Sequence, residues 1–293
     1  MSVLNGEAYL RLAIDSILGQ GFIDFEMLII DNASTDGTAA ILDSYIDARI
    51  VRLRNDRVLT LTESLNRGLN KARGKYVARL DSDDVASPIR LERQVDYLDS
   101  HENVVLIGTH ARKIDDHGTV IGEFTPPIDS EELYQTLAHS NPFVHSAVMF
   151  RRDAAFDGYP KKFIYAQDFA LWLVLAQRGR LAMIGEPLVD MREHGTRIGR
   201  SPMYEDARIR ETVGLYRLAL QLPALTLETR QRGRIELARR YYFFSIDYWR
   251  GGRPLAAIHQ LASCFMIAPI FCLERLWVRV KLVRKLIQSK FLS

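Results

Sequence analysis

Three carboxylates crowd into the stretch RLDSDDVASP, residues 79–88, directly after an apolar run. Asp81, Asp83 and Asp84 lie within four positions, and carboxylates this close raise one another's pKa unless a positive charge lies between them. Mg²⁺ and Mn²⁺ prefer carboxylate oxygens and commonly bind through one or two of them together with substrate phosphates. The stretch is therefore either a solvated turn that begins a helix or a binding site for a divalent cation.

A second polar turn, DNASTD at residues 31–36, ends another short apolar segment. Asp31 closes the run MLIID, and the residues Ser34, Thr35 and Asp36 are of the types that set turns and cap helices. We therefore expect a strand to end at Asp31 and a helix to begin a few residues later.

The segments around both turns alternate between helical and strand patterns. Helices are predicted at 7–18, 38–45 and 61–72, and strands at 26–30, 48–53 and 75–80. Strands separated by helices predict βαβ units and a mostly parallel sheet flanked by helices. Such sheets bind ligands at the carboxyl ends of their strands, and both acidic turns fall at that edge.

The composition of the 293 residues is that of a globular protein, with 47% hydrophobic and 26% charged residues. The net charge of +3 is too small to suggest a nucleic-acid binder. Two cysteines, Cys264 and Cys272, fit a reducing compartment better than a disulfide-built domain. Because no signal-peptide pattern follows Met1, we expect a cytoplasmic protein.

Seven segments, in order, resemble those of family 2 glycosyltransferases, which have a nucleotide-binding α/β fold of the A type, similar to the Rossmann fold. They are SVLNGEAYLRLAIDSILGQ, FEMLIIDNASTDGT, SLNRGLNKARGKYVARLDSDDVASPIRLERQ, IGTH, NPFVHSAVMFRR, AQDFALWLVLAQRG and PLVDMREH. The resemblance implies a catalytic domain at 1–203, and the basic, aromatic-rich helices predicted after it form a separate helical region at 204–293.

In that family an Asp-x-Asp pair holds a divalent cation, Mn²⁺ or Mg²⁺, against the diphosphate of a nucleoside-diphosphate sugar. Carried over, Asp83 is the direct metal ligand, and Asp81 faces the ribose or the waters of the metal. Asp84 is interpreted as a helix-start residue. The resemblance also places Asp31 beside the base and ribose, with Asn32 where the family often has a second acid.

The same resemblance assigns Asp168, in AQDFALW, as the catalytic base of an inverting enzyme, with Gln167 where the family commonly has Glu. The residue types alone allow a capping acid at a helix start instead. His194, in MREH, is assigned to the metal shell, and His145 and Arg192 are minor candidates for contacts with phosphate or acceptor. Trp172 fits the apolar face of a helix and is predicted to lie in the core.

The resemblance also exposes a gap at the beginning of the sequence. Met1 falls where the first strand of the family finishes, so no residues are expected to form that strand. A late assigned start or a truncated gene would explain the gap. Otherwise we expect a chain that folds poorly or binds the donor weakly, because a parallel sheet without a central strand leaves backbone groups unpaired.

Two features of the C-terminal region bear on membranes. The apolar stretch 255–273 contains His259 and Pro269, which favours a buried helical hairpin or an interfacial segment over a span. Residues 274–293 carry six Lys or Arg against one acid, Glu274, in an amphipathic helical pattern. This helix suits the inner face of the cytoplasmic membrane or, equally, packing on the catalytic domain.

The sequence therefore predicts an enzyme: an inverting, metal-dependent glycosyltransferase of the hexosyltransferase class, acting in cell-envelope polysaccharide biosynthesis. It would move a sugar from a nucleoside-diphosphate sugar to a hydroxyl of a saccharide or lipid-linked glycan. The alternative is a catalytically impaired remnant or nucleotide-sugar-binding protein. A nucleotidyltransferase is disfavoured because the sequence shows no basic, glycine-rich loop for a nucleoside triphosphate.

Overall fold

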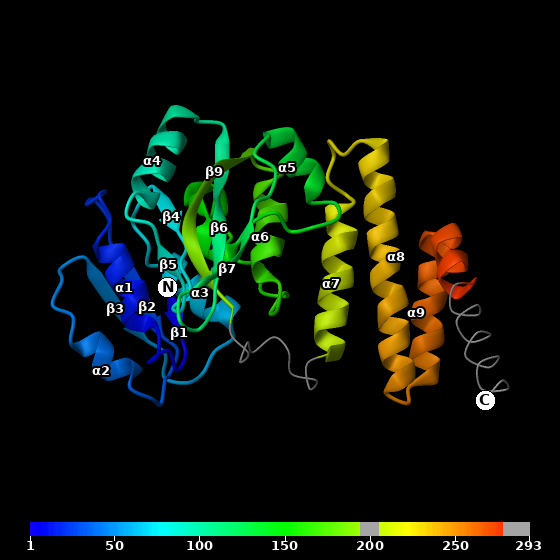
Figure 1. Ribbon diagram of the computed structural model, residues 1–293, viewed down its shortest axis with the longest axis horizontal. Coiled ribbons are helices and arrows are strands. Elements are labelled where there is room, and N and C mark those ends of the chain that lie inside the picture. Colours follow the sequence, from blue (N-terminus) through cyan, green and yellow to red (C-terminus); the bar gives the residue numbers. More distant parts are fainter. Residues whose placement is uncertain (194–204, 278–293) are drawn as a thin grey trace. The chain divides into compact units, whose positions relative to one another are not determined.

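The computed structural model describes residues 1–193 and 205–277 (Figure 1). The contacts divide the chain into two compact units. The first unit comprises Met1–Tyr134 and Asn141–Pro202, and the second comprises Gln135–Ser140 and Met203–Ser293. Each unit is described by itself below.

A small parallel sheet begins the first unit. Its strands, in spatial order, are β1 (Ser2–Val3), β2 (Met27–Asp31) and β3 (Ile50–Arg54). The expectation that no residues remain for a first strand is therefore wrong in one respect, since two residues pair with the carboxyl end of β2. The helices of this part are α1 (Leu10–Leu18), α2 (Thr38–Asp43) and α3 (Leu61–Leu69).

Local sequence explains how these helices form and pack. In α1 the buried residues Leu10, Ala13, Ile14 and Ile17 are three or four positions apart, so they share one face. Helix α3 begins with a capping box between Thr60 and Glu63. The parallel ladder aligns the carboxyl ends of β1 and β2, which positions the loops that follow them side by side.

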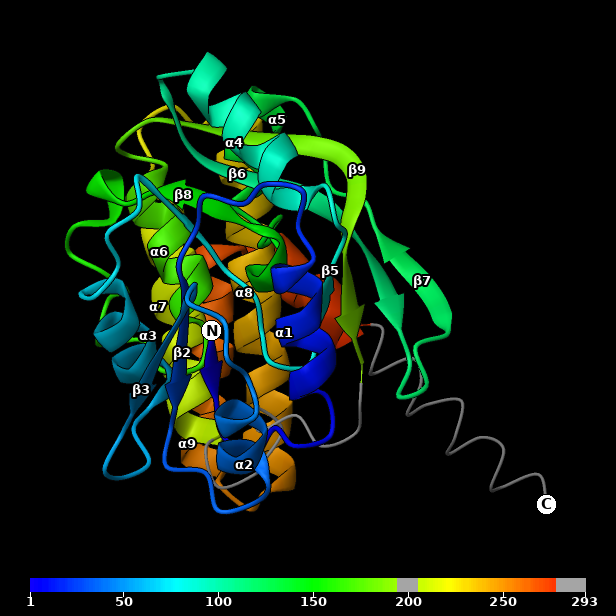
Figure 2. The ribbon, with the colours of Figure 1, turned by 90° about the vertical axis from the view of Figure 1, so that its left-hand side faces the viewer.

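The second sheet of this unit is mixed, not mostly parallel as predicted (Figure 2). Its strands run in the order β4 (Tyr76–Ala78), β8 (Met149–Arg151), β6 (Val104–Ile114), β9 (Arg180–Arg192) and β5 (Val85–Ala86). Strand β7 (Val120–Phe124) pairs with β6. Only β6 and β9 are parallel; the short turn before β7 and the reversed course of β8 make the other pairings antiparallel.

Helices α4 (Arg90–Ser100), α5 (Ser130–Thr136) and α6 (Gln167–Leu175) complete the first part of the chain, with short 3₁₀ turns at His145–Ala147 and Asp153–Ala155. Helix α6 is buried almost all round. Trp172 is fully buried within it, which confirms the predicted core position.

The second unit is helical, as predicted. Helices α7 (Glu205–Ala219), α8 (Leu227–Arg250) and α9 (Pro254–Ile267) are followed by a helical segment at 269–277. Helix α9 stops before Ala268 because Pro269 follows, and Cys264 and Cys272 on either side of this break are both buried in a shared core with Tyr241.

Within residues 1–193 and 205–277, none of the helices is long and apolar enough to cross a membrane. The stretch 255–273 is broken at Ala268 into two helical segments. It is not buried as a whole, since Leu255, Met266 and Ile270 are 83%, 77% and 74% exposed. Most of the basic C-terminal helix predicted at 274–293 lies outside the described residues.

Candidate active site

The acidic turn at 81–84 follows β4 and forms hydrogen bonds with a buried serine. The Asp81 amide donates a hydrogen bond to Ser146 Oγ (3.0 Å), and the Ser146 hydroxyl donates to Asp81 Oδ2 (3.0 Å). Ser146 is fully buried in the 3₁₀ turn at His145–Ala147. This reciprocal pair of hydrogen bonds orients the Asp81 carboxylate.

A buried arginine lies beside the same carboxylate. Arg79 directly follows β4, and its Nη2 pairs with Asp81 Oδ1. Burial alone would raise the pKa of Asp81, but the Arg79 charge, with the Ser146 hydrogen bond, lowers the pKa to about 2. Asp81 is therefore ionised at neutral pH.

Asp84 is not the helix-start residue that the sequence suggested. The two-residue strand β5 separates it from α4, and its Oδ1 accepts a hydrogen bond from the Arg192 amide of β9 (2.8 Å). Asp84 is only 4% exposed. Burial, then the charges of Asp81 and Asp83, raise the pKa of Asp84 to about 7. Three carboxylates thus concentrate negative charge at one turn.

The Arg192 side chain stabilises the backbone around this turn. Its Nε donates to the Asp83 carbonyl (3.1 Å), its Nη1 donates to the Asp115 carbonyl (2.7 Å), and its guanidinium lies 4.2 Å from the centre of the Tyr9 ring. Because Arg192 is buried in these contacts, it serves to position the turn, and a direct contact with phosphate is disfavoured. The Asp83 side chain is half-buried.

Asp168 lies in the first turn of α6 and belongs to the same electrostatic environment. Its Oδ2 accepts a hydrogen bond from Asn141 Nδ2 (3.1 Å). Burial raises the pKa of Asp168, and the Asp81 charge raises it further, although Asn141 and the Phe169 amide act in the opposite direction. Asp81 and Asp168, 87 residues apart in the sequence (168 − 81), are therefore close enough in space for their charges to interact.

His145 lies under this site as a neutral side chain. Its Nε2 is 2.9 Å from the Tyr159 hydroxyl, and its ring meets Trp172 edge-on at 6.0 Å between centroids. Burial and the Arg79 charge lower the pKa of His145 to about 3. An uncharged, packed histidine supports the site but contributes no positive charge to it.

At the end of β2, the side chains of Asp31 and Asn32 interact with other groups of the chain itself. Asp31 Oδ1 accepts from the Ser34 amide (2.9 Å), and Oδ2 lies 3.6 Å from Arg54 Nε. Asn32 is buried, with its Oδ1 accepting from Asn55 Nδ2 (2.7 Å) and the Leu59 amide (3.0 Å). The amide that was assigned to a base edge is thus largely used to join two loops.

One glycine connects the two acidic turns. The loop after β1 donates from the Asn5 amide to Ser34 Oγ (3.0 Å), and a Cβ placed on the next residue, Gly6, would lie 3.5 Å from Ser82 Oγ. The loop after β1 therefore lies near both acidic turns, although β2 and β4 belong to two different sheets and not to one shared sheet edge as predicted.

A divalent cation can be tested against these side chains. In the described parts of the chain, no three His, Cys, Asp or Glu side chains form a group that could hold a metal ion. His194, assigned to the metal shell, lies outside the described residues. Two carboxylates, Asp81 and Asp83, fit a hard cation that takes its remaining oxygen ligands from water and a diphosphate.

Sequence reasoning missed the groups that hold the acids. Ser146 and Asn141 lie in the segment NPFVHSAVMFRR, which was recognised, but neither carries a charge or a spacing pattern that would single it out. Only the three-dimensional pairing with Asp81 and Asp168 reveals their roles.

The family of the chain is shown by its sequence. The family model "Glycosyl transferase family 2" matches residues 1–159. The chain belongs to this family. It is 33% identical over 201 residues to the putative glycosyltransferase EpsE of Bacillus subtilis, an alignment that covers 66% of this chain and 71% of that protein. It is 34% identical to the O-antigen biosynthesis glycosyltransferase WbnJ of Escherichia coli, with 59% and 68% covered.

Solved structures support the fold of this glycosyltransferase. TarS residues 1–349 of S. aureus in complex with UDP-GlcNAc superposes with a TM-score of 0.68 at 18% identity, covering 92% of this chain and 80% of that one. The mannosyltransferase PcManGT of Pyrobaculum calidifontis, in complex with GDP-Man and Mn²⁺, gives a TM-score of 0.58 at 18% identity, with 96% and 78% covered.

Proposed function

We propose that this glycosyltransferase is an inverting, cation-dependent enzyme that moves a sugar, a hexose or a related residue, from a nucleoside diphosphate to a hydroxyl. The acceptor is a saccharide or lipid-linked glycan of a polysaccharide pathway, in keeping with relatives named for amylovoran and O-antigen biosynthesis. The observation that carries this proposal is the electrostatic linkage of Asp81 and Asp168, since donor and acceptor chemistry must meet at one place.

The donor side of the site is formed by Asp83 and Asp81, with Asp31 assigned to the base and ribose. The buried amide of Asn32, bonded to Asn55 and Leu59, holds the neighbouring loop and is not assigned a contact with the donor. When bound, a divalent cation supplies Lewis-acid stabilisation to the negative charge that develops on the leaving diphosphate. Arg79 and Ser146 hold Asp81 ionised and oriented for this purpose. Burial and then repulsion from Asp81 and Asp83 raise the pKa of Asp84, and the repulsion is relieved when positive charge enters the turn.

The acceptor side is Asp168. Its raised pKa makes the carboxylate a better proton acceptor than an ordinary exposed aspartate, as a general base requires. The Asn141 amide donates to Oδ2 of this carboxylate, and the backbone amides of Asp168 and Phe169 also hydrogen-bond to it. In this role Asp168 takes the proton of the acceptor hydroxyl as that oxygen attacks the anomeric carbon.

A second candidate function is a nucleotide-sugar-binding protein with impaired catalysis. The observation that favours it is the interruption of the sheet: β1 pairs with β2 over only two residues, and β4 belongs to a separate sheet. A sheet that supports the site less firmly would hold the side chains of the site less precisely. Catalysis depends on that precision more strongly than donor binding does.

A panel of nucleotide sugars, tested with Mn²⁺ for binding by calorimetry and for release of the nucleoside diphosphate, separates the two functions. The proposed enzyme binds one donor and releases diphosphate faster with an acceptor glycan. In Asp168→Asn the transfer rate is expected to fall by roughly 10²–10⁴-fold with donor binding kept. Asp153→Asn, at an exposed acid beginning another short helical turn, is the matched control. Full activity in Asp168→Asn would contradict the assignment.

A further inference from the structure

Helix α9 is apolar on both of its sides. It lies beside α8 (Figure 1), and one side, with Ala257 and Cys264, is buried; Cys264 shares a core with Tyr241 and Tyr242 of α8. In a globular protein, a helix that is apolar all round is normally buried all round. Here the opposite side is exposed, so its apolar character needs another explanation.

The exposed apolar positions of α9 recur every three or four residues, which places them on one face of the helix. The segment 269–277 repeats the pattern after the break at Ala268. Because Cys264 and Cys272 share one core, both segments expose the side that points away from α8. We call these exposed residues the α9 face: Leu255, Ile258, Ala262, Phe265, Met266, Ile270, Leu273 and Trp277.

The charges beside the α9 face are basic where the helix begins. Arg250 and Arg253 are exposed just before α9, and from Tyr248 to Leu273 the sequence contains no Asp or Glu. Among the exposed residues of α9, His259 alone is polar. A protein partner usually meets a polar rim that offers hydrogen bonds, whereas an anionic lipid surface requires only apolar side chains with basic ones beside them.

A tryptophan lies near each end of the α9 face. Trp249, near the end of α8, is 65% exposed, and Trp277 is 59% exposed, whereas the third tryptophan of the chain, Trp172, is fully buried. Tryptophan is enriched at the boundary between membrane and water, because its ring is largely apolar and carries one polar N–H group. The positions of Trp249 and Trp277 therefore favour a lipid surface as the partner.

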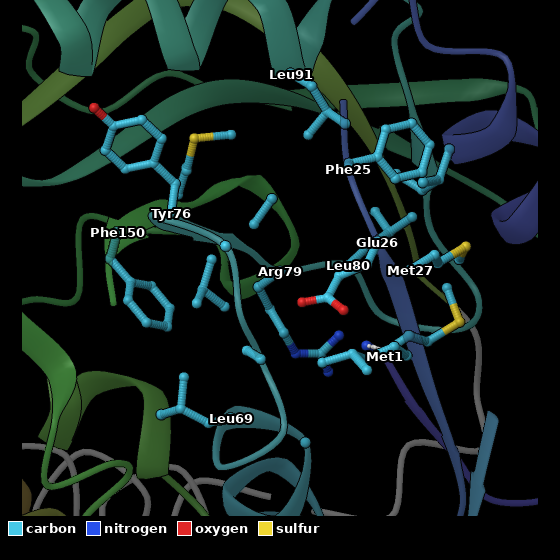
Figure 3. A pocket seen from close by; sticks show the side chains of 18 of the residues that line it. Met1, Phe25, Glu26, Met27, Leu69, Tyr76, Arg79, Leu80, Leu91 and Phe150 are labelled. Carbon is cyan, nitrogen blue, oxygen red and sulfur yellow. Dashed lines mark hydrogen bonds between the residues drawn. The ribbon is translucent and has the colours of Figure 1, made fainter. Parts of the chain in front are cut away.

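The apolar cavity of the first unit, of about 880 Å³, is a different kind of surface (Figure 3). Its lining combines apolar side chains such as Phe25 and Leu69 with charged groups of both signs, among them Arg79 and Glu26. A lining of mixed sign has no preference for anionic head groups. The α9 face differs because its apolar residues are accompanied at the start of the helix by arginines.

We propose that the α9 face binds the surface of a membrane that contains anionic lipids, with α9 lying along that surface. Because the other side of α9 is packed on α8, only the exposed side chains enter the apolar layer, while Arg250 and Arg253 contact the head groups. The sequence pattern alone allows a buried hairpin or an interfacial segment here, and the exposure of the α9 face favours the second. The proposal goes beyond the transfer reaction, since neither donor nor acceptor takes part in it.

The test sediments the full chain with vesicles of phosphatidylcholine alone or of equal parts of phosphatidylcholine and phosphatidylglycerol. Met266→Gln combined with Ile270→Gln is expected to weaken binding to the mixed vesicles by about tenfold or more, because two large apolar side chains no longer enter the apolar layer. Ile23→Gln combined with Ile46→Gln, at similarly exposed positions of the first unit, is the matched control and should bind as the unchanged chain does.

Two further measurements test the basic residues and the tryptophans. Arg250→Gln and Arg253→Gln are each expected to weaken binding to the mixed vesicles by about fivefold, and binding should fall as salt is added. Lipids brominated on their acyl chains should quench the emission of Trp249 and Trp277 in the unchanged chain. This reading needs no variant, so it does not depend on how a substitution affects folding.

The proposal is wrong if the unchanged chain does not bind the mixed vesicles, or if the two double variants bind them equally. Sedimentation without quenching by the brominated lipids would place the contact outside α9. A dimer on size-exclusion chromatography that Met266→Gln with Ile270→Gln dissociates, in a chain that binds no vesicles, would assign the α9 face to a second copy. None of these measurements uses transfer activity, so the proposed function can fail independently.

Discussion

The two acidic turns have similar residues at the same kind of place, yet their carboxylates are in opposite situations. In the turn after β2, Asp31 accepts from the Ser34 amide, while Asp36 accepts from the amides of Glu7 (3.1 Å) and Thr38 (3.0 Å). Burial opposes ionisation of Asp36, but these hydrogen bonds lower its pKa overall. The carboxylates of this turn are stabilised by the chain itself.

In the turn after β4 the carboxylates conflict with one another. Asp81 depends on the buried Arg79 for its charge, and Asp84 is pushed toward protonation by burial and by its neighbours Asp81 and Asp83. A turn whose carboxylates already accept hydrogen bonds from the chain is stabilised little by a bound cation. A turn whose carboxylates repel one another is stabilised much more. The contrast supports the proposal that the cation and donor bind at the second turn, and it does so without reference to any relative.

The largest expected effect is on catalysis. Asp83→Asn removes the charge assigned to the cation, and because a bound cation supplies several kcal/mol of charge stabilisation, the transfer rate should fall by roughly 10²-fold or more. Asp36→Asn is the matched change in the other turn and should leave the rate nearly unchanged. Initial rates of diphosphate release at saturating Mn²⁺ measure both.

Equal losses of transfer rate in Asp83→Asn and Asp36→Asn would contradict the difference between the two acidic turns, since both would then take part in binding. A normal rate in Asp83→Asn would remove Asp83 from the cation site and leave Asp81 as its remaining carboxylate.

The second prediction concerns stability and its pH dependence without metal. The pKa of Asp84 is raised in the folded state to about 7 from an ordinary 3.8. Stability contributed by its protonated form is complete below pH 4 and is lost as the pH rises through 7. Asp84→Asn keeps an acceptor for the Arg192 amide but carries no charge, so in EDTA at pH 8 it should be more stable, by at most about 4 kcal/mol.

Denaturant unfolding at pH 5 and pH 8 measures this difference, which should grow with pH and shrink when Mn²⁺ is added. Asp36→Asn should show the opposite sign above its unfolded pKa, because the pKa of Asp36 is lowered by folding. Destabilisation of Asp84→Asn at pH 8 would mean that the hydrogen bond to Arg192 outweighs the repulsion.

Local patterns in the sequence predicted the elements that end at both turns. The strands ending at Asp31 and near Arg79 and the buried position of Trp172 follow from short apolar runs and helical spacing. The mixed sheet does not, because β4 pairs with β8 through contacts such as Val77 with Phe150, 73 residues apart (150 − 77). No local period records which strand becomes a neighbour.

Asp84 shows why the site was only partly predictable. An acid four residues before Pro88 has the local signature of a helix start, yet its side chain is bonded to Arg192, 108 residues away. Likewise Ser146 and Asn141 acquire meaning only through Asp81 and Asp168. The charges of the site were visible in the sequence, whereas the groups that balance them come from distant segments.

The smallest expected effect lies in the backbone of the first turn. Ala33 has a φ of 61°, a left-handed conformation that costs a residue with a Cβ about 1–2 kcal/mol. Ala33→Gly removes that strain but adds conformational freedom to the unfolded chain, so a net gain in stability of about 0.5 kcal/mol is expected.

Asn5 has a similar φ of 54°, but its Oδ1 accepts from the Thr35 amide (2.9 Å), so Asn5→Gly should cost about 1 kcal/mol of stability. Thermal unfolding of both variants measures these opposite signs. A gain in stability in Asn5→Gly would show that the side-chain hydrogen bond of Asn5 does not stabilise the turn after β2. The hydrogen bonds within the chain would then stabilise this turn less than those of its carboxylates indicate.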